Sequence, residues 1–165
     1  MTISVFDALL NPNSVALIGA SDNPLRIGGR PLKYLKNSGY EGQVFPVNPN
    51  RDMVQDVKAF SDLLSLPLTP DVALLAVPAS ATLQSVKDCA DAGVTSAIVF
   101  SAGFSEAGMD GESMQKEMVG IAKEANLRLL GPNCLGVFNA YKQYYGTFSA
   151  ILDNKFIEYC NEIYP

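Results

Sequence analysis

Residues 15–29 read Val-Ala-Leu-Ile-Gly-Ala-Ser-Asp-Asn-Pro-Leu-Arg-Ile-Gly-Gly. The four apolar residues at the start predict a strand that is buried on both faces, and Gly19 allows the chain to turn sharply after it. Gly28 and Gly29 allow main-chain N–H groups to approach a ligand closely before a helix begins. Because the start of a helix offers unpaired N–H donors and a partial positive charge, this junction predicts a phosphate site.

The loop departs from the usual dinucleotide fingerprint, Gly-x-Gly-x-x-Gly. Ser21 and Pro24 stand where the second and third glycines belong. The sequence therefore predicts a variant phosphate loop. Its candidate ligand contacts are Gly19, Ala20, Ser21 and Gly28. Glycine-rich turns between a strand and a helix also occur where nothing binds, so a purely structural loop is the alternative.

Strand and helix patterns alternate along the rest of the chain. Strands are expected at about 14–19, 43–47, 57–60, 71–77, 96–100 and 127–130. Helices are expected at 2–12, 30–38, between Pro78 and Ala92, and at 111–125. Such alternation predicts a Rossmann-like, doubly wound α/β fold, with a mainly parallel sheet of about six strands and helices on both faces. Ligands of such sheets bind at the carboxyl ends of the strands.

Composition narrows the class of protein. The chain has 165 residues, 48% of them hydrophobic, and a net charge of −5, which argues against nucleic acid as a partner. No apolar run reaches the length of a membrane span, and the N-terminus lacks a basic segment followed by an apolar one, so a soluble, cytoplasmic protein is expected. The three cysteines have neither paired metal spacing nor the density of a secreted disulfide scaffold, which predicts no metal site and a reducing compartment.

The sequence contains no histidine. Histidine is the most common general acid or base and the most common metal ligand in proteins. A Ser-His-Asp triad, a Cys-His dyad, a histidine-bearing zinc site and a phosphohistidine are therefore excluded within these residues. We assign no catalytic residue.

The predicted end of the second strand reads Val47-Asn-Pro-Asn-Arg51. An enzyme that uses NAD usually places an acidic residue here, on the ribose hydroxyls. A cation suits a phosphorylated ribose instead, as in NADP or at the 3′-phosphate of coenzyme A, and arginine can hold a phosphate with two parallel donors. Asn48 and Arg51 are the candidate contacts, and a solvated loop charge is the alternative for Arg51.

Three further strand ends carry candidate ligand contacts. Val77 and Pro78 form an apolar lip that can pack against an adenine ring, although a plain strand terminus explains them equally well. The other two segments, 101–106 and 131–136, combine glycines with polar groups and resemble ligand walls. Their candidate contacts are Ser101, Gly103, Asn133 and Cys134. Cys134 either lies near a ligand thiol or is a buried small hydrophobe, and the absence of histidine argues against a nucleophile.

Taken together, the motifs resemble the CoA-binding domain of NDP-forming acyl-CoA synthetases. This superfamily contains the ADP-forming acetate–CoA ligases and the succinyl-CoA synthetase α subunit, and the same domain opens some protein acetyltransferases. The resemblance covers about residues 4–149. It rests on Val15-Ala-Leu-Ile-Gly-Ala-Ser21, Gly28-Gly29, Phe45-Pro-Val-Asn-Pro49, Asp71-Val-Ala-Leu-Leu-Ala-Val-Pro78, Ser101-Ala-Gly-Phe-Ser-Glu106 and Gly131-Pro-Asn-Cys-Leu-Gly136.

The resemblance implies a Rossmann-like domain with coenzyme A as its cofactor. The Ser21 loop and Gly28 would lie near the phosphates, the Val77-Pro78 lip near the adenine, and the Asn133-Cys134 loop toward the pantetheine thiol. In the family, a lysine commonly follows the Val-Asn-Pro segment and meets a CoA phosphate. Asn50 stands at that place here, and Arg51, which comes next, is the expected substitute.

The end of the chain departs from the family. Its members continue after a segment like Gly146-Thr-Phe-Ser149 into a second α/β domain with the phosphohistidine and then into an ATP-grasp part. Residues 150–165 match neither. The expected organisation is a CoA-binding domain over 1–149 and a C-terminal tail over 150–165, which is either a helix that caps the domain or the product of truncation or a shifted reading frame.

The function implied is that of the CoA-binding module of an acyl-CoA ligase, without the phosphohistidine and ATP-grasp parts. It would bind CoA or acyl-CoA and act with a separate ligase subunit or domain, because it cannot complete ligation alone. Two alternatives stay open: an NADP-dependent oxidoreductase, and a stand-alone regulatory subunit that senses CoA. The sequence leaves open whether the chain forms oligomers.

Overall fold

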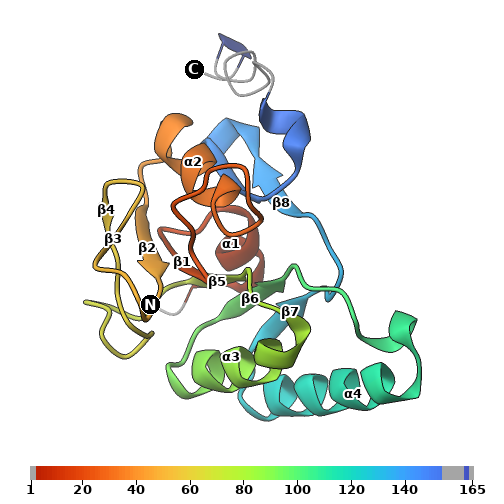
Figure 1. The fold of residues 1–165 in the computed structure, drawn as a ribbon. Helices are drawn as coiled ribbons and strands as arrows, with labels where there is room; N and C mark the ends of the chain where they lie inside the picture. Colours follow the sequence, from red (N-terminus) through yellow and green to blue (C-terminus); the bar gives the residue numbers. More distant parts are fainter. Residues whose placement is uncertain (1–2, 154–161, 164–165) are drawn as a thin grey trace.

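Five parallel strands form the central sheet of the computed structural model, which describes residues 3–153 and 162–163 (Figure 1). The strand order is β2-β1-β5-β6-β7, and every neighbouring pair is parallel. The strands are β1 (Ser14–Ile18), β2 (Gln43–Val47), β5 (Val72–Leu75), β6 (Ser96–Val99) and β7 (Arg128–Leu130). The expected mainly parallel α/β fold is therefore confirmed.

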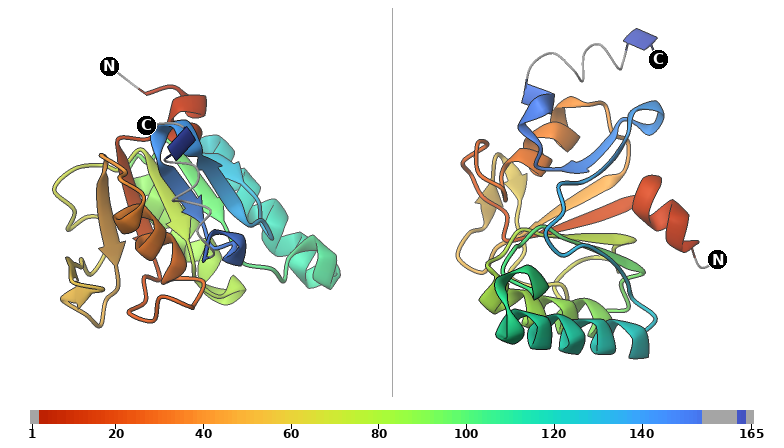
Figure 2. Two further views of the ribbon diagram at one scale, coloured as in Figure 1. Left: turned by 90° about the horizontal axis from the view of Figure 1, so that it is seen from above. Right: turned by 90° about the vertical axis from the view of Figure 1, so that its right-hand side faces the viewer.

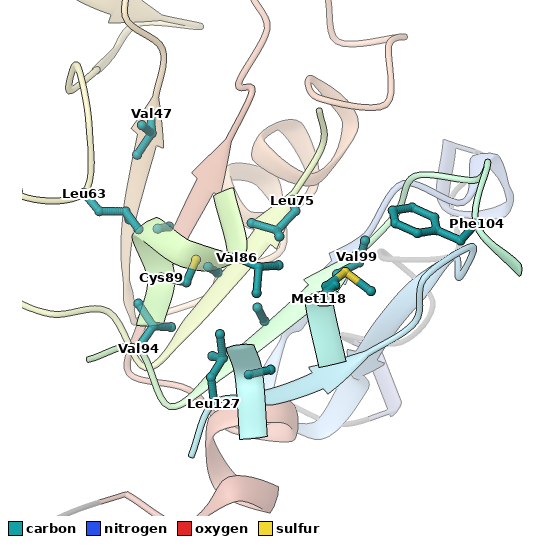
Figure 3. Packing of buried hydrophobic residues seen from close by; sticks show 14 residues of the cluster. Val47, Leu63, Leu75, Val86, Cys89, Val94, Val99, Phe104, Met118 and Leu127 are labelled. Atoms are coloured by element: carbon teal, nitrogen blue, oxygen red, sulfur yellow. The ribbon is translucent and has the colours of Figure 1, made fainter. Parts of the chain in front are cut away.

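Helices cover both faces of this sheet (Figures 1 and 2). One face packs against α3 (Ala79–Asp91) and α4 (Met109–Glu124), whose side chains join the cluster drawn in Figure 3. The other face packs against α2 (Arg30–Asn37) and a hairpin of β8 (Gly136–Asn139) and β9 (Tyr144–Thr147). The short helix α1 (Val5–Leu10) contacts β6 and β8.

The apolar strand residues divide between the two faces because successive side chains of a strand point in opposite directions. In β1, Ala16 belongs to the cluster on the α3 side, whereas Val15 and Leu17 belong to the cluster on the α2 side. In β5, Leu75 and Leu74 divide in the same way. This burial on both sides explains why the strands read as continuous apolar runs.

A strand does form within the expected range 57–60, but it does not join the main sheet, which has five strands rather than about six. β4 (Val57–Lys58) pairs with β3 (Met53–Val54) in a separate antiparallel hairpin. A tight turn at 55–56 returns the chain onto itself, so this segment reaches the main sheet only at the bridge between Val47 and Phe60. The β8-β9 hairpin was not expected from the sequence.

Asp153 fixes the start of the tail to α2. It ends a short 3₁₀ turn, Ala150–Asp153, and its carboxylate accepts hydrogen bonds from Arg30 (3.3 Å), Lys33 (2.7 Å) and the Tyr34 hydroxyl (3.0 Å). The rest of the expected tail helix falls mainly on 154–161 and 164–165, which lie outside the described residues. No helix among the residues that the structure describes is long and apolar enough to cross a bilayer.

This contact gives a pH-dependent contribution to stability. The hydrogen bond from Lys33 holds the pKa of Asp153 below its usual range, while burial and the bond to Asp153 raise the pKa of Tyr34 to about 12. A depressed carboxyl pKa stabilises the folded chain at neutral pH, and that stabilisation is lost as pH falls through the depressed value. Asp153→Asn should therefore lower the melting temperature at neutral pH and by progressively less in acid. A difference from the wild type that stays constant with pH would contradict this prediction.

Candidate functional site

The predicted site residues all lie at or beyond the carboxyl ends of the strands. The chain passes from β1 to β2 on one side and returns to β5 on the other side of β1, so the carboxyl ends of β1 and β5 form a topological switch point. Crevices at such points are the usual ligand sites of open α/β sheets. The candidate residues follow β1 (Gly19, Ala20, Ser21, Gly28), β2 (Asn48, Arg51), β5 (Val77, Pro78), β6 (Ser101, Gly103) and β7 (Asn133, Cys134).

Hydrogen bonds tie neighbouring strand ends together. The Asn48 side-chain amide donates to the carbonyl oxygen of Ala20 at 2.8 Å, which joins the ends of β2 and β1. The Ser101 hydroxyl donates to the carbonyl oxygen of Val77 at 2.9 Å, and the Asn133 main-chain N–H donates to Ser101 at 2.9 Å. The candidate residues therefore form one edge with a defined geometry.

The glycines of the first loop are required by the packing of the loop itself. Gly19 has φ +82°, and a Cβ placed on it would lie 2.6 Å from the carbonyl oxygen of Ala76. A Cβ on Gly28 would clash with the carbonyl oxygen of Gly19, and one on Gly29 with that of Asn23. The sharp turn expected at Gly19 is present. Gly28 and Gly29 were expected to allow close approach to a ligand, whereas in the structure they allow the loop to fold tightly against the ends of β1 and β5.

The folded loop leaves main-chain donors for a ligand. The Ser21 N–H donates to the carbonyl oxygen of Gly28 at 3.0 Å and closes the neck of the loop. The main-chain N–H groups of Asp22, Ile27 and Gly28 donate no hydrogen bond to any residue that the structure describes. Main-chain N–H groups clustered in a turn before a helix are suited to an anion.

Arg51, the expected contact of a ligand phosphate, lies beside this loop and is paired. Its guanidinium forms an ion pair with the Asp22 carboxylate, and the two side chains are 52% and 43% exposed. Asp22 also accepts a hydrogen bond from the main-chain N–H of Gln55 at 2.9 Å. A ligand phosphate at Arg51 would therefore meet both a cation and a carboxylate. Sequence reasoning missed Asp22, although it stands within the loop next to Ser21.

A pocket of about 490 Å³ opens at the ends of β1, β2 and β5. The connection from β2 to β5 contains no helix, so this part of the sheet is covered only by α3 and by the segment around Leu63. Val47, Leu63 and Cys89 of α3 belong to one buried cluster, which Figure 3 shows. The lining includes the predicted residues Gly19 and Val77, and sequence reasoning missed the rest: Ile18, Val47, Pro49, Ser61, Asp62, Leu63, Leu64, Asp88 and Asp91.

Comparison with known proteins decides the family. Residues 13–140 match the family described as CoA binding domain. The chain belongs to this family. Over 148 residues it is 36% identical to the α subunit of acetate–CoA ligase [ADP-forming] II of Pyrococcus furiosus, which covers 89% of the chain and 32% of that protein. The expected resemblance is confirmed.

Solved structures agree with this assignment. An acetyl-coenzyme A synthetase of Ca. Korarchaeum cryptofilum, solved with phosphate and ADP, superimposes with a TM-score of 0.83 at 35% identity over 90% of this chain and 31% of the other. A conserved hypothetical protein of Pyrococcus furiosus gives 0.56 at 29% identity over 71% of this chain and 90% of its own. The chain thus spans between about a fifth and a third of the length of the ligase relatives that it matches.

The remaining candidates of this CoA-binding domain lie along the edge, outside the lining of the 490 Å³ pocket. The Ser101 hydroxyl also lies 2.8 Å from the hydroxyl of Thr82, which is fully buried in α3. Gly103 has φ +104°, and its N–H donates to the carboxylate of Glu106 at 2.7 Å. That hydrogen bond lowers the pKa of Glu106. The 101–106 segment is therefore held in place by internal contacts.

Cys134 is a half-buried thiol in this CoA-binding domain. Its Sγ donates to the carbonyl oxygen of Val99 at 3.4 Å, and burial raises its pKa. The thiolate is the reactive form, so a raised pKa lowers the reactivity of the side chain at neutral pH. Alkylation of Cys134 by iodoacetamide at neutral pH, followed by peptide mass spectrometry, is expected to be slower than that of a free cysteine peptide. Equal rates would contradict the structural reading of Cys134.

Proposed function

We propose that the chain binds coenzyme A or acyl-CoA at the carboxyl ends of β1, β2 and β5, as the CoA-binding part of an ADP-forming acyl-CoA ligase. The observation that carries the proposal is the 490 Å³ pocket, which lies at the switch point, adjoins the glycine loop and belongs to a chain of the CoA-binding family. Predominantly apolar pockets with a few polar groups are the common form of cofactor sites.

The residues present fit the parts of CoA. The apolar wall of Val47, Leu63 and Val77 suits the adenine ring. The donors of the 19–29 loop suit the pyrophosphate, and Arg51 suits the 3′-phosphate. In this proposal the pantetheine arm runs along the edge of the sheet, past the end of β6, toward Asn133 and Cys134, which follow β7.

The chemical role of these residues is to position the thiol. In ligation the CoA sulfur attacks an activated acyl group, and a bound, oriented nucleophile reacts faster because its entropy is already reduced. This chain has no histidine to carry a phosphoryl group. A separate domain or subunit would therefore supply the activated acyl group, and the domain organisation proposed is a CoA-binding unit over 1–149 followed by the tail.

Calorimetric titration with CoA, dephospho-CoA, NAD and NADP tests the proposal. CoA is expected to bind more tightly than dephospho-CoA and much more tightly than NAD. If the chain binds NADP but not CoA, the oxidoreductase is favoured instead. If it binds NAD tightly and does not bind CoA, the proposal is contradicted.

A second candidate function is a stand-alone CoA sensor. It is favoured by the hypothetical protein of Pyrococcus furiosus, because this chain covers 90% of that protein's length. Such a protein would bind CoA and no ligase subunit. Isolation of the tagged chain from its native host separates the two functions: recovery of a partner with an ATP-grasp domain supports the ligase, whereas CoA binding by the chain alone, with no such partner, supports the sensor.

A further inference from the structure

The turn of the β3-β4 hairpin has an unusual backbone for its residues. Gln55 and Asp56 have φ values of +48° and +64°. Two-residue hairpin turns with both φ values positive strongly favour Asn-Gly, because a side chain in the left-handed region is disfavoured. A glutamine that persists at such a place must be held by its surroundings.

Gln55 is held by four hydrogen bonds. Its side-chain amide nitrogen donates to the carbonyl oxygens of Ser21 and Gly29, both at 2.9 Å, which uses both amide hydrogens. Its main-chain N–H donates to the Asp22 carboxylate at 2.9 Å, and its carbonyl oxygen accepts from the Lys36 ammonium of α2. One residue of the hairpin therefore contacts both the glycine loop and the helix after it.

The two side-chain contacts span the neck of the glycine loop. Ser21 stands on the leg that leaves β1, and Gly29 on the leg that enters α2. A donor that binds both carbonyl oxygens fixes the spacing of the legs. Fixing that spacing constrains the loop that carries the main-chain N–H groups of Asp22, Ile27 and Gly28, which have no acceptor among the described residues.

We infer that Gln55 is a positioning residue for the pyrophosphate of CoA, because its side-chain amide holds the glycine loop in the conformation that presents these N–H groups. The inference rests on the proposed function for the identity of the ligand. Asp56 is the natural control. It has the same left-handed backbone, and its exposed side chain makes no hydrogen bond with the described part of the chain.

The test compares Gln55→Gly with Asp56→Gly. Both changes relieve the left-handed strain, but only the first removes the bridging amide. Calorimetry is carried out with CoA and with 3′-AMP, which carries the adenine and the 3′-phosphate but no pyrophosphate. Gln55→Gly is expected to weaken the binding of CoA about tenfold, the effect of losing one or two net hydrogen bonds, and to change the affinity for 3′-AMP by less than about twofold. Asp56→Gly should change the affinity for either ligand by less than about twofold.

Unchanged CoA binding by Gln55→Gly, or equal losses for CoA and 3′-AMP, would overturn the inference. Gln55→Glu, which keeps the side-chain length but loses both donors, is measured as well and replaces the glycine variant if that variant does not fold. Amide hydrogen exchange without ligand gives a separate readout. Exchange over 21–28 should be faster in Gln55→Gly than in Asp56→Gly, and equal rates would overturn the inference. If the wild type binds no CoA but the two variants still differ in exchange, the proposed function is refuted while the structural role of the Gln55 side chain stands.

Discussion

Arg51→Glu is expected to weaken the binding of CoA by about 100-fold and that of dephospho-CoA by less than about fivefold. The substitution removes the cation proposed for the 3′-phosphate and places a second carboxylate beside Asp22, the present partner of Arg51. The measurement is calorimetry with both ligands. Arg128→Glu is the matched control, because it makes the same charge change on an exposed residue at the start of β7.

Asp22→Asn gives the reciprocal result. Asparagine keeps an oxygen that can accept from the Gln55 N–H but removes the charge that offsets Arg51. CoA binding should therefore become a few times tighter, while dephospho-CoA binding should change less. Equal changes for the two ligands in both variants would show that Arg51 does not contact the 3′-phosphate.

Gly28→Ala is expected to lower the free energy of unfolding by about 2–3 kcal/mol and the affinity for CoA by more than about tenfold. The added Cβ would clash with the main-chain oxygen of Gly19, so the loop must move away from the end of β1. Urea denaturation measures the stability, and calorimetry measures the binding.

Gly120→Ala is the control for this substitution. Gly120 lies in α4, and, apart from its chain neighbours and the nearby backbone of its own helix, no described atom lies within 4 Å of a Cβ placed on it. Alanine should raise stability there by about 0.5–1 kcal/mol, since it favours the helix, and should leave CoA binding unchanged. If Gly28→Ala lowers the free energy of unfolding by no more than the size of the change in Gly120→Ala, the clash inferred at Gly28 is contradicted.

The elements that could be predicted from the sequence are those whose burial requires apolar residues. β1, β5 and β6 are covered on both faces, so their apolar runs were unmistakable. The strand within 57–60 was expected in the main sheet but forms a hairpin with β3 instead, which the sequence did not indicate because the turn Gln55-Asp56 lacks the Asn-Gly pair that marks a tight hairpin. Its left-handed backbone depends on contacts with the glycine loop and α2, which no local pattern reveals.

The candidate site also has a part that the sequence predicts and a part that it does not. Its position was predictable because the carboxyl ends of parallel strands meet at one edge, so loops far apart in sequence could be placed together. The pairing of Arg51 with Asp22 and the bridge from Gln55 to Ser21 were not predictable, since they join residues 29 and 34 positions apart. The pocket wall at Leu63 was missed because it follows from the absence of a helix between β2 and β5.

The most direct test of CoA binding at the switch point is a titration of the isotopically labelled chain with CoA, followed by amide NMR. The account predicts that the shifts concentrate at 19–29, at 48–51 and at 76–79, and that Arg51→Glu reduces them. A different cavity of about 550 Å³, lined by Val119, Lys123 and Arg128 among others, provides the contrast. Shifts confined to that cavity, or none at millimolar CoA, would contradict the account.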